Sequence, residues 1–112
     1  MEKMKMISAL ANAELQKIEA AFVLEQKMSY LNRAKRLVAM HYNAEVQWSL
    51  LRSRGESPEM ASTFLEIATE AYHEAKAEVA RLELEVAVLV TKLEVAELNH
   101  SDLVGKALDM GF

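Results

Sequence analysis

The feature that most constrains this chain is its shortage of the residues that make turns. Its 112 residues include only 3 Gly and 1 Pro, whereas an average domain of this size has about a dozen of the two together. Folds built from strands need many tight turns, and Gly and Pro are the residues that form them. The sequence therefore predicts an all-α fold made of a few long helices.

Composition excludes several further classes of protein. The hydrophobic share of 52% and the charged share of 27% are typical of a globular chain. The absence of Cys excludes disulfides, Cys–zinc sites, iron–sulfur clusters and thiol nucleophiles. The longest apolar runs, such as residues 86–90, are far too short to span a membrane. Lys3 and Lys5 are not followed by a signal-peptide pattern, so we expect a cytoplasmic protein with no membrane contact.

One strong break divides the chain, and it lies at residues 52–59. Gly55 suits the left-handed residue that follows a helix, Ser57 suits an N-cap, and Pro58 suits the first helical position. A weaker break at residues 99–102 predicts that a short last helix is separate. The expected single domain, residues 1–112, thus comprises a first helix over about 3–53, a turn over 54–57, a second helix over about 58–99 and a C-terminal helix over about 102–110.

The stretch after the turn carries a heptad repeat, the pattern by which helices pack along a seam. Its two sets of positions are Leu65, Tyr72, Val79, Val86 and Leu93, and Ala61, Ala68, Ala75, Leu82, Leu89 and Ala96. For the first helix we expect one side to hold Leu15, Ile18, Phe22, Leu24, Met28, Leu31, Val38 and Tyr42. One short connection makes the helices antiparallel, so residues whose numbers add up to about 111 should lie side by side. The prediction is a long, coiled-coil-like helical hairpin in which Lys27 lies near Glu85.

Both predicted helices carry more hydrophobic surface than a hairpin can cover. A second stripe of the later helix lies away from its heptad seam, and residues 23–51 of the earlier helix have one at sevenfold spacing. Two helices in a hairpin bury one stripe each, so we expect the hairpins to pack into an oligomeric helical bundle. The residues expected to contact a partner are Met4, Ile7, Leu84, Val88, Val95, Leu98 and Phe112.

Charge is divided unevenly along the chain. Residues 1–54 hold 9 Lys and Arg against 5 Glu, and residues 55–112 hold 4 Lys and Arg against 12 acidic residues. The basic half makes nucleic-acid binding an alternative function, because Lys and Arg bind phosphates. Neutralisation of the acidic helix within the hairpin is the simpler interpretation, since the net charge is −4. The residues of this alternative are Lys27, Arg33, Lys35, Arg36, Arg52 and Arg54.

The pattern Glu-x-x-His occurs twice, over residues 70–73 and 97–100. Such pairs bind iron in ferritin-like bundles because both side chains leave one helical face. Surface residues without a ligand explain the spacing more simply, and we expect no cofactor. The residues of this second alternative, a carboxylate–histidine metal site, are His41, Glu45, Glu70 and His73.

No constellation of catalytic residues is present in the sequence. The chain lacks a Gly-rich phosphate loop and a nucleophile elbow, and its two Asp residues both lie near the C-terminus. We therefore expect a non-enzymatic protein–protein interaction module, whose partners are itself and another protein. Such a module acts as an adaptor, an assembly component or a small inhibitor that covers a partner's site. The small size and the Met-rich ends also fit a product of a phage or a mobile element.

Overall fold

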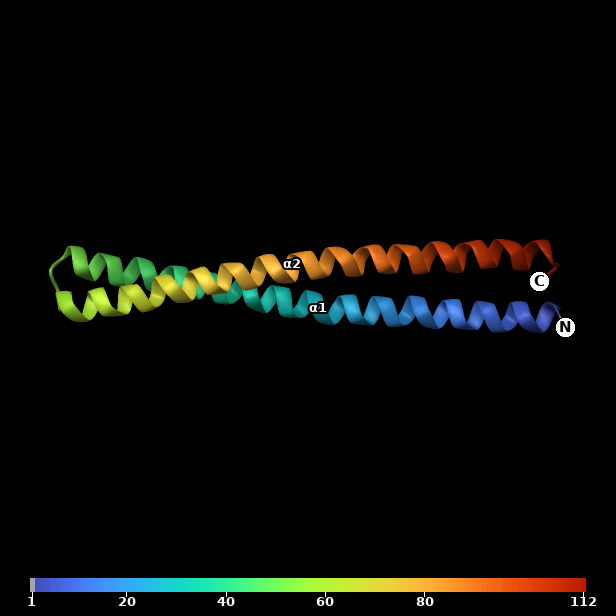
Figure 1. The fold of residues 1–112 in the computed structure, drawn as a ribbon, viewed down its shortest axis with the longest axis horizontal. Helices are drawn as coiled ribbons and strands as arrows, with labels where there is room; N and C mark the ends of the chain where they lie inside the picture. Colours follow the sequence, from blue (N-terminus) through green and yellow to red (C-terminus); the bar gives the residue numbers. More distant parts are fainter. Residues whose placement is uncertain (1) are drawn as a thin grey trace. The chain divides into compact units, whose positions relative to one another are not determined.

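The computed structural model describes residues 2–112, and in that range it contains two long α-helices and no strand. Helix α1 spans Glu2–Ser53 and helix α2 spans Pro58–Asp109. A short turn joins them, so that the chain forms a helical hairpin (Figure 1). The predicted all-α class, the hairpin and the position of the turn are confirmed. Within residues 2–112, no helix combines the length and the hydropathy that crossing a membrane requires.

The end of α1 is fixed by a pair of backbone hydrogen bonds. The N–H of Glu56 donates to the carbonyl oxygen of Leu51, and the N–H of Gly55 donates to that of Arg52, both over 3.1 Å. This pair is the Schellman motif, which needs a left-handed residue, and Gly55 supplies it with φ of 72°. Residues 107–112 repeat the motif at the end of α2, where the glycine has φ of 88°. Two of the three glycines are thus helix terminators.

Helix α2 does not end near residue 99, so the prediction of a separate C-terminal helix over residues 102–110 is wrong. The heptad spacing continues without a phase change, and its positions 100, 103, 107 and 110 are buried or half-buried. Ser101 and Asp102, the expected capping residues, stay exposed within the helix. Tertiary packing of the apolar face overrides the weak local preference of these residues for a helix end.

The helices divide into two compact units. The terminal unit joins the part of α1 up to Met28 to the part of α2 from Glu85 onward, and the turn unit comprises Ser29–Leu84. In each unit α1 and α2 pack along a seam in which buried or half-buried residues alternate at spacings of three and four. On α2 this seam is the predicted heptad. In the terminal unit it contains Met6, Leu10, Ala13, Lys17, Ala20, Leu24 and Lys27 of α1, and in the turn unit Leu31, Ala34, Val38, His41, Glu45 and Trp48.

The seam of α1 differs from the side that the sequence predicted. Leu24, Leu31 and Val38 lie in it as expected. The rest of the predicted side, which is Leu15, Ile18, Phe22, Met28 and Tyr42, is exposed. The true seam includes charged residues and alanines, so its hydrophobic periodicity is weaker than that of the exposed stripe beside it. The prediction for α1 was therefore wrong for most of its length.

Contacts across the seam establish the antiparallel register. Trp48 stacks on Phe64 with ring centroids 4.8 Å apart. The Lys27 Nζ lies 3.1 Å from Oε2 of Glu85, which confirms the predicted neighbourhood of this pair. Among residues 2–112 the buried hydrophobic residues are few and mostly small: Ala13, Leu31, Ala34, Ala61, Ala68, Leu82 and Ala107. Five of these seven residues are alanine, so the hairpin buries little apolar surface.

Candidate functional site

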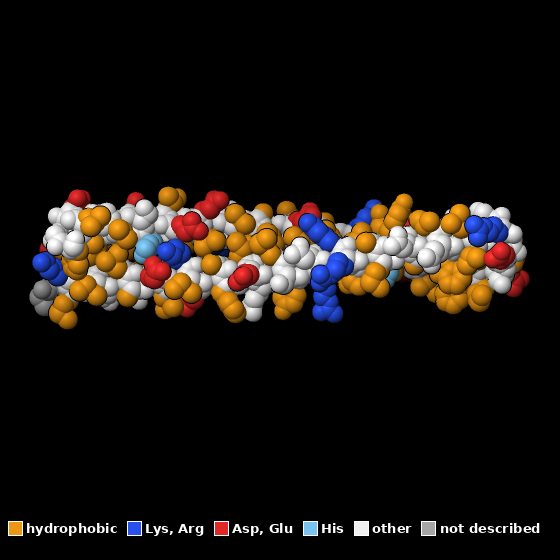
Figure 2. All heavy atoms as spheres, turned by 180° about the vertical axis from the view of Figure 1, so that it is seen from behind, with side chains coloured by type: hydrophobic (Ala, Val, Ile, Leu, Met, Phe, Trp, Pro, Cys, Tyr) orange, Lys and Arg blue, Asp and Glu red, His pale blue; other side chains and the backbone are white. Residues whose placement is uncertain are grey.

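The most unusual property of the described chain is the amount of hydrophobic surface that it exposes. Between residues 2 and 112, 24 large hydrophobic side chains are exposed. The accessible surface is 8155 Å², whereas a compact monomer of 12.6 kDa has about 6,200 Å². Figure 2 shows hydrophobic side chains over much of one face, with charged side chains between them.

All seven residues that the sequence predicted for partner contact are exposed. Their exposed fractions run from 46% for Phe112 to 72% for Met4 and Leu84. On α2, Val88, Val95 and Leu98 follow one another at spacings of seven and three, so they share one helical face. We name Val88, Val95 and Leu98, which all lie in the terminal unit, the outer stripe of α2; Leu84 is exposed on the turn unit. The heptad seam, which packs on α1, lies on the opposite face of this helix, so α1 does not cover the outer stripe.

A second hydrophobic surface lies on the turn unit and draws on both helices. Its members, here named the apolar face of the turn unit, are Tyr30, Leu37, Met40, Met60, Phe64 and Ile67, all of them exposed. Leu37 and Ala71 line a shallow groove of about 250 Å³ between the helices, with Glu74 and Glu78 also in its lining. The groove shows that Leu37 of α1 and Ala71 of α2 lie on the same side of the turn unit, and helical spacing along each helix places the other members of the face on that side.

Most of the apolar face of the turn unit was missed by the sequence analysis. Tyr30 and Leu37 were recognised as part of an unpaired stripe, but Met60, Phe64 and Ile67 were not. The last three lie directly beside the seam at spacings of four and three, and the line continues four residues later at Ala71. Hydrophobic residues at this spacing, along either side of the seam, are the sequence signal that identifies them.

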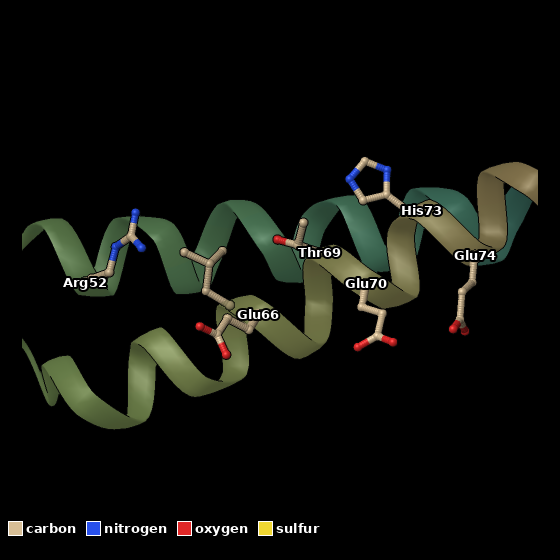
Figure 3. A pocket seen from close by; sticks show the side chains of 7 residues that line it. Arg52, Glu66, Thr69, Glu70, His73 and Glu74 are labelled. Atoms are coloured by element: carbon tan, nitrogen blue, oxygen red, sulfur yellow. The ribbon is translucent and has the colours of Figure 1, made fainter.

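Another depression of the turn unit, about 570 Å³ in volume and wide open, is lined mostly by residues with polar side chains. Arg52 of α1 and Glu66, Thr69, Glu70, His73 and Glu74 of α2 line it, together with Leu65. Figure 3 shows the imidazole of His73 on one side of α2 and the carboxylates of Glu70 and Glu74 on the other. The Glu-x-x-His pair of this helix therefore does not converge on one point.

The four residues of the metal alternative are not brought together. His41 and Glu45 are half-buried in the seam of α1, and Glu70 and His73 are exposed on α2. Among residues 2–112, no group of three or more His, Asp and Glu side chains is arranged to hold a metal ion. The expected register places these residues level with one another, but their positions around the helices keep them apart.

The basic residues of the nucleic-acid alternative face in different directions. Lys27 lies in the seam and forms a salt bridge with Glu85. The remaining five, Arg33, Lys35, Arg36, Arg52 and Arg54, are exposed on the turn unit. Arg33 and Arg36 share a face of α1, whereas Lys35 lies on another. Arg52 lines the same depression as Glu66 and Glu70 of α2, so the surface around it is not purely basic.

A cluster of polar side chains joins the two helices of the terminal unit. Glu14 of α1 binds Lys17 of the same helix over 3.3 Å and His100 of α2 over 2.7 Å, in both cases through its Oε2. Glu97 and Lys17 line the shallow depression beside this cluster. These contacts fill polar positions of the seam, and the groups are already bonded to one another, so the cluster has a structural role.

The chain has no significant match among protein-family models, curated proteins or solved structures. The surfaces of the chain itself therefore indicate what it can bind. Those surfaces are apolar helical faces, and the two depressions of the turn unit are open and shallow. Faces of this kind suit contact with another protein better than the enclosure of a small molecule.

Proposed function

We propose that this chain is a non-enzymatic interaction module that associates with itself and with another protein through its exposed helical faces. The observation that supports this proposal is the exposure of 24 large hydrophobic side chains between residues 2 and 112, against only seven buried hydrophobic residues. Soluble monomers rarely expose apolar patches larger than about 300–600 Å². Association with another helical surface removes such patches from water.

The module acts by presenting a preformed helical surface. The outer stripe of α2 has the spacing by which a helix docks on a partner helix or in a groove. An adaptor, an assembly component and a small inhibitor in the cytoplasm all use such a surface. Residues at the two chain ends, Met4, Ile7 and Phe112, extend the exposed hydrophobic area of the terminal unit.

The experiment that tests self-association is a measurement of molar mass in solution. Sedimentation equilibrium over about 1–100 μM should give a mass that is a multiple of 12.6 kDa. Circular dichroism on the same samples should show a predominantly helical chain. A mass of 12.6 kDa at all of these concentrations, with the helix content intact, would contradict the proposal of self-association.

A further inference from the structure

We propose that a second copy of this chain binds the apolar face of the turn unit, with α1 of each copy lying over α2 of the other. In this dimer the two turns lie at the same end. The inference rests on the proposed self-association and states which surface makes it and in which orientation. Both copies use the same face, so the contact closes on itself as a two-fold symmetric dimer.

The first argument is the distribution of apolar and charged residues along this face. Two lines of residues flank the seam on this side, and near the turn they are mainly apolar. On α1 the line holds Met40, Ala44 and Leu51 with one polar residue, Gln47, and on α2 it holds Met60, Phe64, Ile67 and Ala71. Farther from the turn charged residues join the lines: Arg33 on α1, between Tyr30 and Leu37, and Glu74, Glu78 and Arg81 on α2. With the two turns at the same end, apolar positions of one copy meet apolar positions of the other, and charged positions meet charged positions.

The second argument is the segregation of charge between the helices. In the turn unit, residues 29–54 of α1 and the turn carry 5 Lys and Arg against 1 Glu. Residues 55–84 carry 2 Lys and Arg against 7 Glu. A two-fold axis parallel to the helices places the basic α1 of one copy over the acidic α2 of its partner. A two-fold axis across the helices would place α1 over α1 and α2 over α2, which are like-charged pairs.

The third argument is the area available for burial. A standard stable interface removes about 800 Å² from each partner. The accessible surface of 8155 Å² exceeds that of a compact monomer by roughly 2,000 Å². A dimer face of standard size therefore leaves part of this surplus exposed. The outer stripe of α2 is then still available for the other protein of the proposed function.

Substitution of one exposed residue tests the location of the contact. Ile67→Asp places a carboxylate in the middle of the proposed interface, and we expect the dimer to dissociate at least about tenfold more readily. Val46→Asp is the matched control, because Val46 is also exposed but follows Leu37 by nine residues and lies on the opposite side of α1. Sedimentation equilibrium measures both. A dimer that resists Ile67→Asp but dissociates with Val46→Asp would overturn the inference.

A charge exchange between chains tests the orientation without placing a charge in an apolar site. In the proposed dimer Arg33 of each copy lies level with Glu78 of the partner. Arg33→Glu and Glu78→Arg should each weaken the homodimer by about tenfold, because each introduces two like-charged contacts. An equimolar mixture of the two variants restores both attractions in a heterodimer, so dimerisation should recover on mixing. Failure to recover on mixing, with recovery in the doubly substituted chain, would mean that the pair lies within one chain.

A single thiol at the turn provides a direct readout of orientation. The chain has no Cys, so Glu56→Cys introduces one unique thiol per copy. A short bis-maleimide should link two copies at this position, whereas Arg36→Cys, on an outward position of α1, should remain unlinked. In the opposite orientation, with the same faces in contact, the two turns would be about 30 Å apart, beyond the reach of a short reagent.

The outcomes separate this inference from the function on which it rests. If the unmodified chain is a monomer, the proposed self-association and the inferred dimer interface are both wrong. If it is a dimer that Ile67→Asp leaves intact, or if the thiol of the Glu56→Cys variant is not linked, self-association stands and the inference is wrong.

Discussion

Polar side chains occupy several positions in the seam of α1, and their surroundings differ. Lys27 is paired with Glu85 of α2, and Lys17 with Glu14 of its own helix. Glu45 lacks an equivalent arrangement, because its Oε2 is buried without a hydrogen-bond donor. A buried oxygen with no donor destabilises the folded state by about 1–3 kcal/mol relative to an apolar group of similar size.

We therefore predict that Glu45→Leu stabilises the protein. The substitution removes the unsatisfied oxygen and adds an apolar side chain to the seam, so the free energy of unfolding should rise by about 1–3 kcal/mol. Denaturation by urea at a fixed protein concentration measures the change. Glu19→Leu is the control, because Glu19 is an exposed glutamate of the same helix that lies outside the seam. A decrease in stability for Glu45→Leu would show that the Glu45 carboxylate is satisfied in solution.

The glycines of the two helices differ in what they do for the fold. Gly55 is in the left-handed region with φ of 72°, where an alanine side chain is strained. Gly105 lies inside α2, and a Cβ built there meets no atom within 4 Å. The same substitution at these two positions should therefore have opposite effects on stability.

We predict that Gly55→Ala lowers the free energy of unfolding by about 1–2 kcal/mol. Gly105→Ala should raise it by about 0.5–1 kcal/mol, because alanine has less backbone freedom to lose on helix formation. Thermal denaturation monitored by circular dichroism, at one protein concentration, compares the two variants. Equal effects of the same sign would mean that one of the two residues does not have the backbone conformation described here.

The sequence predicted α2 far better than α1, and the composition of the two seams explains why. The seam of α2 is marked by residues such as Leu65, Val79 and Leu89, whose spacing identifies the buried face. The seam of α1 includes Lys17 and Glu45, while its exposed surface carries large hydrophobic residues. Hydrophobic periodicity finds the most apolar face of a helix, and in α1 that face is not the one that packs within the chain.

The limits of prediction at the candidate interfaces have a similar cause. The outer stripe of α2 was found because it lies opposite the seam, where hydrophobic residues are conspicuous. Phe64 and Met60 were missed because they lie directly beside the seam, where hydrophobic residues are expected to be partly covered by the other helix. Only the packing of α1 on α2 shows that these side chains stay exposed.

Folding and association are linked in a molecule with so small a buried core. Five of the seven buried hydrophobic residues are alanines, and 24 large hydrophobic side chains among residues 2–112 remain exposed to water. A dimer adds the burial that the single hairpin lacks. Any binding that occurs only in the folded state adds to stability in proportion to the logarithm of concentration.

We therefore predict that the melting temperature rises with protein concentration. An increase of about a hundredfold in concentration should raise it by several degrees, because dimerisation stabilises the folded chain. The fluorescence of Trp48, the only tryptophan, provides a second probe, since its ring stacks on Phe64 in the proposed interface. Its emission should change over the same concentrations at which the mass changes. A melting temperature that is independent of concentration would contradict this linkage.

The alternation of three and four residues along the seam has a consequence for how such a chain can change in evolution. Each stretch of seven residues repeats the same packing as the one before it. Removal of seven residues from α1 and of the seven that face them on α2 leaves every remaining pair in place. A deletion in one helix alone leaves one end of the other without a neighbour. The hairpin can therefore become longer or shorter only by seven residues in both helices at once. Relatives of this chain should differ in length by such paired steps.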